Sequence, residues 1–294
     1  MKKLALTFKN ISGRIVAMPK GLLESSKKGL IEKIVPVLLV LSIGLAFIVG
    51  ILWEKVSNLE KGGVTTPATT TTTANAGAAQ PTTVTLDTIK GLFSKDLIKF
   101  GDAKRKVLFV EISDPSCPYC QAATGLNPKL NQQMDTTSNR FKLVSDGGTY
   151  LAPVPEMKKL VDAGKASLVY IYYPGHGNGE MGMKALYCAQ EKGKFWEVND
   201  LLMTDAGYTL MNTTVQNDKT KSGTVADFLK SAVDATFMKS CLDSGKYDAR
   251  LASDQDIVKS LPFQGTPDFF VNTTNFAGAY NWTDMKSAVD AALK

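Results

Sequence analysis

The stretch VLFVEISDPSCPYC, residues 107–120, is the most informative part of this chain. Its first six residues form a short, almost wholly apolar run between Lys106 and Asp114, which is typical of a strand buried on both faces. A brief loop leads to Cys117 and Cys120, where a helical pattern begins. The stretch therefore predicts a strand, a loop and a helix, with two cysteines at the first turn of the helix.

A Cys-x-x-Cys pair in this position is typical of thiol redox chemistry. The unpaired N–H groups and the positive end of the helix dipole stabilise a thiolate at Cys117. Cys120 lies one turn along, close enough to attack a mixed disulfide at Cys117. Pro118 costs no hydrogen bond near a helix start.

Two other interpretations of the pair are a zinc site and a purely structural disulfide. A zinc site needs further ligands, but the other cysteines, Cys188 and Cys241, stand 53 residues apart and the chain has one histidine. A disulfide within four residues is strained, and it closes too short a loop to stabilise the fold much. The sequence therefore predicts a redox-active pair, with no metal and no cofactor.

The pattern outside this stretch predicts an α/β domain from about residue 87 to the end. Strands are expected at 166–173, 268–272 and 276–280. Helices are expected at 117–134, with a break near Gly125 and Pro128, and at 155–163, 183–192, 195–203, 225–233, 236–244, 253–259 and 283–293.

The net charge of +6 lies in the first 33 residues, which hold eight Lys or Arg and two Glu. The rest carries 26 charges of each sign, so we expect no nucleic-acid binding.

Residues 34–53 (IVPVLLVLSIGLAFIVGILW) contain no charge and are long enough to cross a bilayer core of about 30 Å. A cleaved signal peptide is the alternative, but Glu54 and Lys55 follow where a small-residue cleavage site is required.

This pattern predicts a single-pass protein of the cell membrane. Residues 1–33 are expected to form a basic cytoplasmic tail, and residues 34–53 a transmembrane helix in the lipid bilayer. Residues 54–86, rich in Thr and Ala, cannot bury a core and are expected to be a linker. The domain at 87–294 is then extracytoplasmic.

This domain resembles the DsbA-like thiol:disulfide oxidoreductases of the thioredoxin superfamily, in their membrane-anchored bacterial form. The resemblance covers about residues 98–294. It rests on VLFVEISD leading to CPYC at 107–120, YPGH at 173–176, ALYCAQEKGKFW at 185–196 and GTP at 265–267. It implies a thioredoxin-like fold with a helical insertion at about residues 179–260.

The resemblance also implies roles for several residues. Pro267 is expected to be cis and to pack beside the cysteine pair, although a trans turn proline is the plainer interpretation. Glu111 matches a buried acid that accepts a proton from Cys120; the alternative is a solvated carboxylate on a half-exposed strand. We expect Pro118, Tyr119 and Thr266 to contact the substrate, with the Thr266 backbone pairing to an extended segment.

Five further residues are expected to shape the fold or the surroundings of the pair. Asp114 is expected to shape the loop or cap the helix, and His176, among glycines, to serve a turn rather than act as a base. Asp268 departs from the family pattern and could disfavour acidic substrates or alter thiolate stability. Cys188 and Cys241 are expected to form a structural disulfide; free buried thiols and a relay with the first pair are the alternatives.

The sequence thus predicts a membrane-tethered enzyme that introduces disulfides into reduced exported proteins and is reoxidised by a membrane redox partner. A reductase or isomerase of the same fold is the alternative within the class. A tethered binding or chaperone module without enzymatic activity is the alternative outside it.

Overall fold

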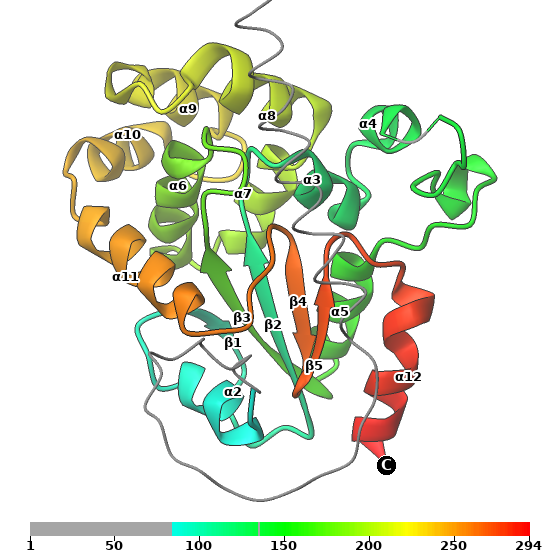
Figure 1. Ribbon diagram of the computed structural model, residues 1–294. Helices are drawn as coiled ribbons and strands as arrows, with labels where there is room; N and C mark the ends of the chain where they lie inside the picture. Colours follow the sequence, from blue (N-terminus) through cyan, green and yellow to red (C-terminus); the bar gives the residue numbers. More distant parts are fainter. Residues whose placement is uncertain (1–83, 135) are drawn as a thin grey trace, which may run out of the picture. The chain divides into compact units, whose positions relative to one another are not determined.

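The computed structural model describes residues 84–134 and 136–294, which form one five-stranded mixed sheet with helices around it (Figure 1). The strand order is β1-β3-β2-β4-β5. The strands are β1 (Ile98–Phe100), β2 (Val107–Ser113), β3 (Ala166–Tyr172), β4 (Asp268–Val271) and β5 (Thr274–Ala277).

Strand β2 is the centre of the sheet. It pairs in parallel with β3, from Val107 opposite Ala166 to Ser113 opposite Tyr172, and antiparallel with β4. All seven of its residues are buried, as the apolar run predicts for a strand covered on both faces. Strands β1 and β5 complete the sheet as antiparallel neighbours of β3 and β4.

The described residues contain eleven α-helices. They are α2 (Leu86–Leu92), α3 (Pro118–Thr124), α4 (Pro128–Gln133), α5 (Pro153–Asp162), α6 (Glu180–Glu191), α7 (Phe195–Leu202), α8 (Asp205–Thr209), α9 (Ser222–Phe228), α10 (Ala235–Asp243), α11 (Asp248–Lys259) and α12 (Trp282–Leu293). Short 3-10 helices occur at Val144–Asp146 and Lys219–Lys221, and a π-helix at Leu210–Val215.

Alternation along β2 gives each face of the sheet its own core. Val110 and Ile112 point to the face that α2 and α11 cover, where they pack with Val258. Phe109 points to the opposite face, where it packs with Met157 of α5 and Trp282 of α12. Each large side chain buried in this way contributes roughly 1.5–3 kcal/mol relative to exposure.

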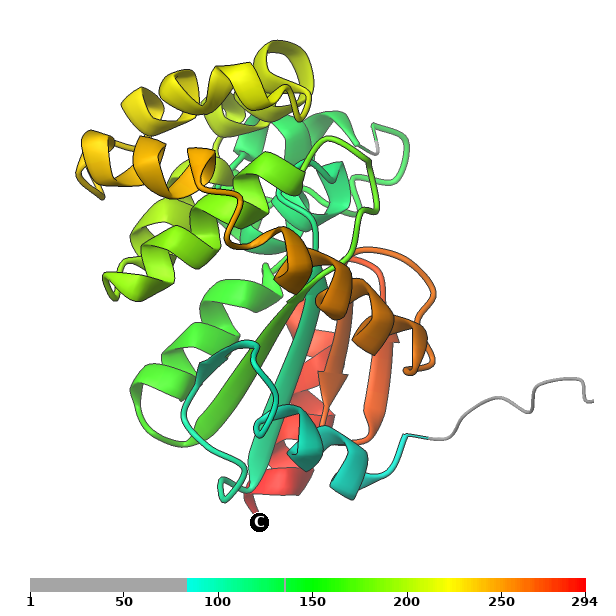
Figure 2. The same cartoon turned by 90° about the vertical axis from the view of Figure 1, so that its left-hand side faces the viewer.

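The helical insertion lies between β3 and β4 and comprises α6 to α11. Its inner side chains, such as Leu186, Val198, Val225 and Met238, form a core of their own that also contacts Tyr170 of β3. Figure 2 shows α6 to α10 at one end of the sheet, the end at which β2 leads into α3. The insertion is therefore placed beside the cysteine pair.

The mixed α/β, thioredoxin-like fold with a helical insertion agrees with the prediction from sequence. The helix expected at 117–134 is broken as predicted, because Gly125 adopts a left-handed conformation with φ 68° and Asn127 caps a new helix. The position predicted for the last strand, 276–280, was wrong. Strand β5 ends at Ala277, because Gly278 with φ 106° turns the chain. Strand β1, helices α2 and α8, and the π-helix were not predicted.

The predicted tail at 1–33, the predicted transmembrane helix at 34–53 and nearly all of the linker at 54–86 lie outside the described residues. Helix α2 begins at Leu86, where the Thr85 hydroxyl accepts a hydrogen bond from the amide of Thr88. In the part of the chain that the structure describes, no helix is long and apolar enough to cross a membrane.

Candidate active site

The two cysteines of the CPYC motif lie where β2 ends and α3 begins. Cys117 is the N-cap of α3, with extended backbone angles, and its amide donates to the carbonyl of Asp114 at 2.9 Å. Pro118 is the first helical residue. Cys117 and Cys120 are both free thiols and both buried, with 4% and 1% of their surface exposed. The structure thus brings together the two residues predicted to carry the redox chemistry.

The loop that carries the cis proline, far away in the sequence, contacts Cys117. The Thr266–Pro267 peptide bond is cis, and the Cys117 thiol donates to the carbonyl of Thr266 at 3.3 Å. The hydroxyl of Thr266 is buried and forms no hydrogen bond of normal geometry with the described residues, although it lies close enough to Cys117 to lower the pKa of that thiol. Gly175 is required beside it, because a Cβ there would lie 1.7 Å from the Thr266 hydroxyl oxygen.

The pKa values of the two thiols are moved in opposite directions. The pKa of Cys117 falls from 9.0 to about 7, mainly through a hydrogen bond from the Cys120 thiol; burial opposes this, and the Thr266 hydroxyl and two backbone amides support it. The pKa of Cys120 is raised well above its ordinary value by burial and by the neighbouring Cys117. Of the two sulfurs, that of Cys117 is therefore the one suited to act as a nucleophile and leaving group, and Cys120 is the thiol that stays protonated.

A buried polar cluster lies behind Cys120. Glu111 on β2 is 2% exposed, and burial raises its pKa to about 8, which excludes the alternative of a solvated carboxylate. The Ser113 hydroxyl is near enough to lower the pKa of both Glu111 and Cys120, although it forms no hydrogen bond of normal geometry. Tyr170, opposite Glu111 on β3, adds a buried hydroxyl without a partner in the described chain. The cluster can hold and pass a proton next to Cys120.

Asp114 holds the loop before the cysteines. It is fully buried and accepts hydrogen bonds from the Ser116 amide and hydroxyl, at 2.8 and 2.7 Å, and from the His176 amide at 2.8 Å. Asp114 therefore shapes the loop rather than capping α3, whose N-cap has no side-chain hydrogen bond. His176 contributes its backbone to this turn and exposes its side chain.

The insertion supplies contacts that the sequence did not predict. The buried Met203, directly after α7, packs against both Cys117 and Cys120. From the π-helix, the Asn212 amide group donates to the carbonyl of Ser116 at 3.0 Å. In addition, the Gln121 side chain of α3 donates to the carbonyl of Leu202, the last residue of α7, at 2.9 Å. Through these contacts the insertion holds the CPYC turn in position.

The interpretation of Asp268 as a group that disfavours acidic substrates is wrong. Its side chain is fully buried and accepts hydrogen bonds from the Gln264 amide, at 3.2 Å, and from the Asn275 side chain. Burial raises its pKa to about 6. Asp268 thus ties the loop that carries Pro267 to β5 and does not face the substrate.

An open groove of about 320 Å³ lies beside the cis proline. Tyr119, which is 47% exposed, forms one wall together with Phe141, whose ring centroid lies 5.8 Å from that of Tyr119. Thr266 and Pro267 also line it. Tyr119 and Thr266, two residues predicted to bind substrate, therefore share one groove, whereas Pro118 does not line it.

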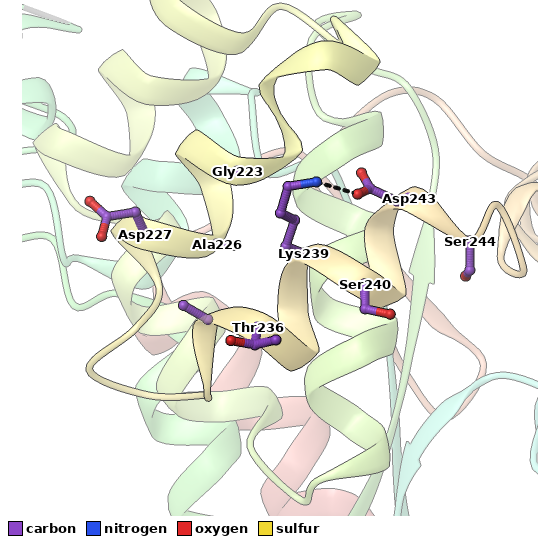
Figure 3. A pocket seen from close by; sticks show the side chains of 9 residues that line it. Gly223, Ala226, Asp227, Thr236, Lys239, Ser240, Asp243 and Ser244 are labelled. Carbon is purple, nitrogen blue, oxygen red and sulfur yellow. Dashed lines mark hydrogen bonds and ion pairs between the residues drawn. The ribbon is translucent and has the colours of Figure 1, made fainter.

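Cys188 of α6 and Cys241 of α10 are joined in a disulfide within the core of the insertion. A larger hollow, of about 670 Å³, lies between α9 and α10 (Figure 3). It is open, and an ion pair between Lys239 and Asp243 belongs to its lining. None of the residues predicted for the site lines this hollow.

Most of the residues that were missed belong to segments without a recognisable motif. Tyr170 is one of several apolar or aromatic residues of a buried strand. Met203 lies directly after α7, and Asn212 lies within the π-helix of the insertion. Only Ser113, within the quoted motif, carried a usable signal: alternation along a strand places residues 111 and 113 on one face.

The fold and this arrangement define a thioredoxin-like domain with a Cys-x-x-Cys pair. A family model described as thioredoxin matches residues 154–291, a segment that includes β3, the insertion and Pro267 but begins after the cysteine pair. Among solved structures, a double variant of alpha-DsbA1 from Wolbachia pipientis is 15% identical, with a TM-score of 0.51, and the similarity covers 71% of this chain and 96% of that one. This similarity shows the fold.

Two further similarities complete the comparison. Oxidised BdbD from Bacillus subtilis is 16% identical with a TM-score of 0.48, over 67% of this chain and 92% of that one. The Na(+)/H(+) antiporter NhaA 3 of Salinispora tropica is 27% identical over 198 residues, which are 66% of this chain and 24% of the antiporter. The chain thus spans about a quarter of the length of the curated relatives it matches.

Proposed function

We propose that this protein is a thiol:disulfide oxidoreductase that introduces disulfides into reduced exported proteins. The observation that carries the proposal is the contact of the Cys117 thiol, at the start of α3, with the carbonyl of Thr266 beside the cis Pro267. This contact places the reactive sulfur at the edge of a groove, and next to backbone with which an extended substrate can pair.

The reaction begins with the oxidised Cys117–Cys120 pair. A substrate thiolate attacks the sulfur of Cys117, the Cys117–Cys120 bond breaks, and Cys120 leaves with the electron pair and takes up a proton. A second substrate thiolate attacks the substrate sulfur of the mixed disulfide and releases Cys117 as a thiolate. The substrate loses two electrons and forms a disulfide, and the enzyme pair gains them. The low pKa of Cys117 makes it a good leaving group in the second step.

Glu111 supplies the proton that Cys120 takes up, and receives it again when the pair is reoxidised. Its raised pKa keeps the carboxyl protonated near neutral pH, and the Ser113 hydroxyl lies close to both groups. Reoxidation needs an acceptor of two electrons, and we assign this role to a membrane redox partner. The apolar run at 34–53 supports a tether that keeps the domain outside the cytoplasm and near that partner.

The alternative is a reductase or isomerase that uses the same pair. The pKa of Cys117 is lowered, mainly by the hydrogen bond from the Cys120 thiol, and the extent of this stabilisation sets the direction of exchange. A less stabilised thiolate makes the pair less oxidising. The direction of exchange is therefore the part of the proposal that needs its own measurement.

The test is the refolding of a reduced, disulfide-dependent protein by the full-length chain in its oxidised form. Wild-type protein is expected to restore activity to the reduced substrate, and Cys117→Ala is expected not to. Full activity of Cys117→Ala would overturn the proposal. The reduction potential of the pair then decides the direction: a value near about −120 mV supports an oxidase, and one near about −270 mV supports a reductase.

A further inference from the structure

The groove beside the cis proline has one charged residue in an otherwise uncharged lining. Four segments form it: Tyr119 of the CPYC motif, residues 140–141, the loop 264–267 and residues 277–279. Apart from Arg140, its lining is apolar side chains, glycines and uncharged polar groups. Such a site is selective for charge, because a single guanidinium determines the sign of the potential within it.

A row of aromatic rings holds Arg140 near the reactive pair. Its guanidinium lies over the ring of Phe141, 5.3 Å from the centroid. Phe141 in turn packs edge-on against Tyr119, which stands between the two cysteines, and against Tyr150 at 5.4 Å. The charge is therefore fixed to the wall of the groove on the side of Tyr119.

No carboxylate of the described residues forms an ion pair with Arg140. Every lysine or arginine found in an ion pair within 84–134 and 136–294 is a different residue. Asp268, next to Pro267, is buried and hydrogen-bonded to Gln264 and Asn275. Within the described part of the chain, the planar guanidinium therefore has its donors available for a carboxylate, which it can bind through two parallel hydrogen bonds.

Backbone in the groove leaves room for an extended segment. Gly265, with φ 152°, and Gly278, with φ 106°, lack side chains, and a Cβ on either would meet no atom within 4 Å. No described residue accepts a hydrogen bond from the Thr266 amide. A segment paired there advances about 3.3 Å per residue, and Thr266 and Arg140 line the same groove, so the side chains a few positions from the reacting cysteine follow the groove that contains Arg140.

We propose that Arg140 makes this groove select extended substrate segments that carry an Asp or Glu side chain within a few residues of the reacting cysteine. The inference rests on the proposed thiol:disulfide exchange and names the substrate class of that same site. It replaces the expectation that Asp268 disfavours acidic substrates.

The experiment uses the oxidised full-length protein and peptides with two cysteines. In each set of peptides, one position is Glu, Gln or Lys, and this position is moved along the peptide on either side of the first cysteine. Mass spectrometry follows peptide oxidation and gives kcat/KM. Arg140 is exposed, so Arg140→Gln and Arg140→Glu leave the core unchanged. The matched control is Arg105→Glu, an equal charge change on an exposed residue just before β2, at the opposite end of that strand from Cys117.

In wild type, the Glu peptide is expected to react about three- to fivefold faster than the Gln peptide at one or two adjacent positions, and the Lys peptide more slowly than either. Arg140→Gln is expected to remove the difference, Arg140→Glu to reverse it, and Arg105→Glu to leave it unchanged. A wild-type ranking in Arg140→Glu, or the same reversal in Arg105→Glu, would overturn the assignment.

The failure of this inference and the failure of the proposed function are distinguishable. If wild type oxidises the Glu, Gln and Lys peptides equally at every position, Arg140 does not select substrates, while disulfide exchange stands. If wild type oxidises and reduces none of them, the proposed function fails, and the substrate class fails with it.

Discussion

The two cysteine pairs of this chain are similarly buried and differ in everything around them. Cys117 and Cys120 are 4% and 1% exposed, and Cys188 and Cys241 are 0% and 6% exposed. The first pair is free and lies at a helix start, against a carbonyl and a polar cluster. The second is a disulfide between two helices, within an apolar core.

Burial alone therefore does not decide what a cysteine does. A reactive thiol needs groups that stabilise its thiolate and a partner within reach, and Cys117 has the Cys120 thiol, the Thr266 hydroxyl and the backbone amides of α3. Cys188 and Cys241 are 53 residues apart, so their bond restricts a long loop of the unfolded chain. One pair is arranged for exchange and the other for stability.

The largest expected effect separates the two pairs by activity. Cys117→Ser is expected to reduce disulfide exchange to the uncatalysed background, because no other thiol reaches the groove with a lowered pKa. When Cys120→Ser is mixed with a substrate in its disulfide form, it is expected to accumulate a mixed disulfide at Cys117, because the Cys117 thiolate breaks the substrate disulfide and the variant has no Cys120 thiol to release the substrate. Non-reducing gels and mass spectrometry measure both. An adduct at Cys188 or Cys241 in the folded protein would contradict this separation.

The next effect separates them by stability. The double variant Cys188→Ala/Cys241→Ala is expected to lose about 4 kcal/mol of unfolding free energy in the chain-entropy account of a loop of this length. Urea unfolding of wild type and variant measures the loss. Exchange activity is expected to be unchanged under conditions in which the variant remains folded. If a folded variant lost its exchange activity, the second pair would act as a relay with the first.

The sequence predicts features formed by neighbouring residues better than contacts between residues that are far apart along the chain. The strand Val107–Ser113 and the helix start at Cys117 are local patterns, and both were predicted. The contact between Cys117 and Thr266 joins residues 149 positions apart, and only the family resemblance pointed to it. Tyr170 and Arg140 carry no local signal at all, since their roles arise from packing between elements.

The sequence also did not predict those strand boundaries that depend on a single turn. Strand β1 has only three residues, too few for a periodic pattern. Strand β5 lies earlier than predicted because Asn272, with φ 52°, begins the turn after β4, and the apolar run alone did not reveal this. The side chain of Asp268 faces the interior for the same reason, since the turn places Asn275 beside it.

A third prediction concerns the buried acid behind Cys120. Because the pKa of Glu111 is raised from 4.5 to about 8 in the folded state, the stability that its protonated form contributes is present below about pH 4.5 and is lost as the pH rises to about 8. Glu111→Gln is expected to remove this loss, roughly 3 kcal/mol between pH 5 and pH 8 at about 1.4 kcal/mol per unit. Urea unfolding at a series of pH values measures it.

The exposed Glu197→Gln on α7 is the control for Glu111→Gln, and its stability is expected to follow the wild-type pH dependence over this range. Glu111→Gln is also expected to slow the step in which Cys120 takes up its proton, which stopped-flow measurement of thiol release resolves. Identical pH profiles of wild type and Glu111→Gln would show that the carboxyl neither titrates in this range nor serves Cys120.

The smallest expected effect tests what makes the first pair different from the second. Thr266→Val keeps the shape of the cis-proline loop but removes the hydroxyl that stabilises the Cys117 thiolate. A hydrogen bond to a charged group contributes about 1.5 kcal/mol, so the pKa of Cys117 is expected to rise by about one unit and the pair to become less oxidising. The thiolate absorbance, followed over a pH titration, measures the change.

Thr274→Val, the same substitution at an exposed position of strand β5, is expected to leave the titration unchanged. Equal titrations of Thr266→Val and wild type would mean that the Cys120 thiol and the backbone amides of α3 hold the Cys117 thiolate without Thr266.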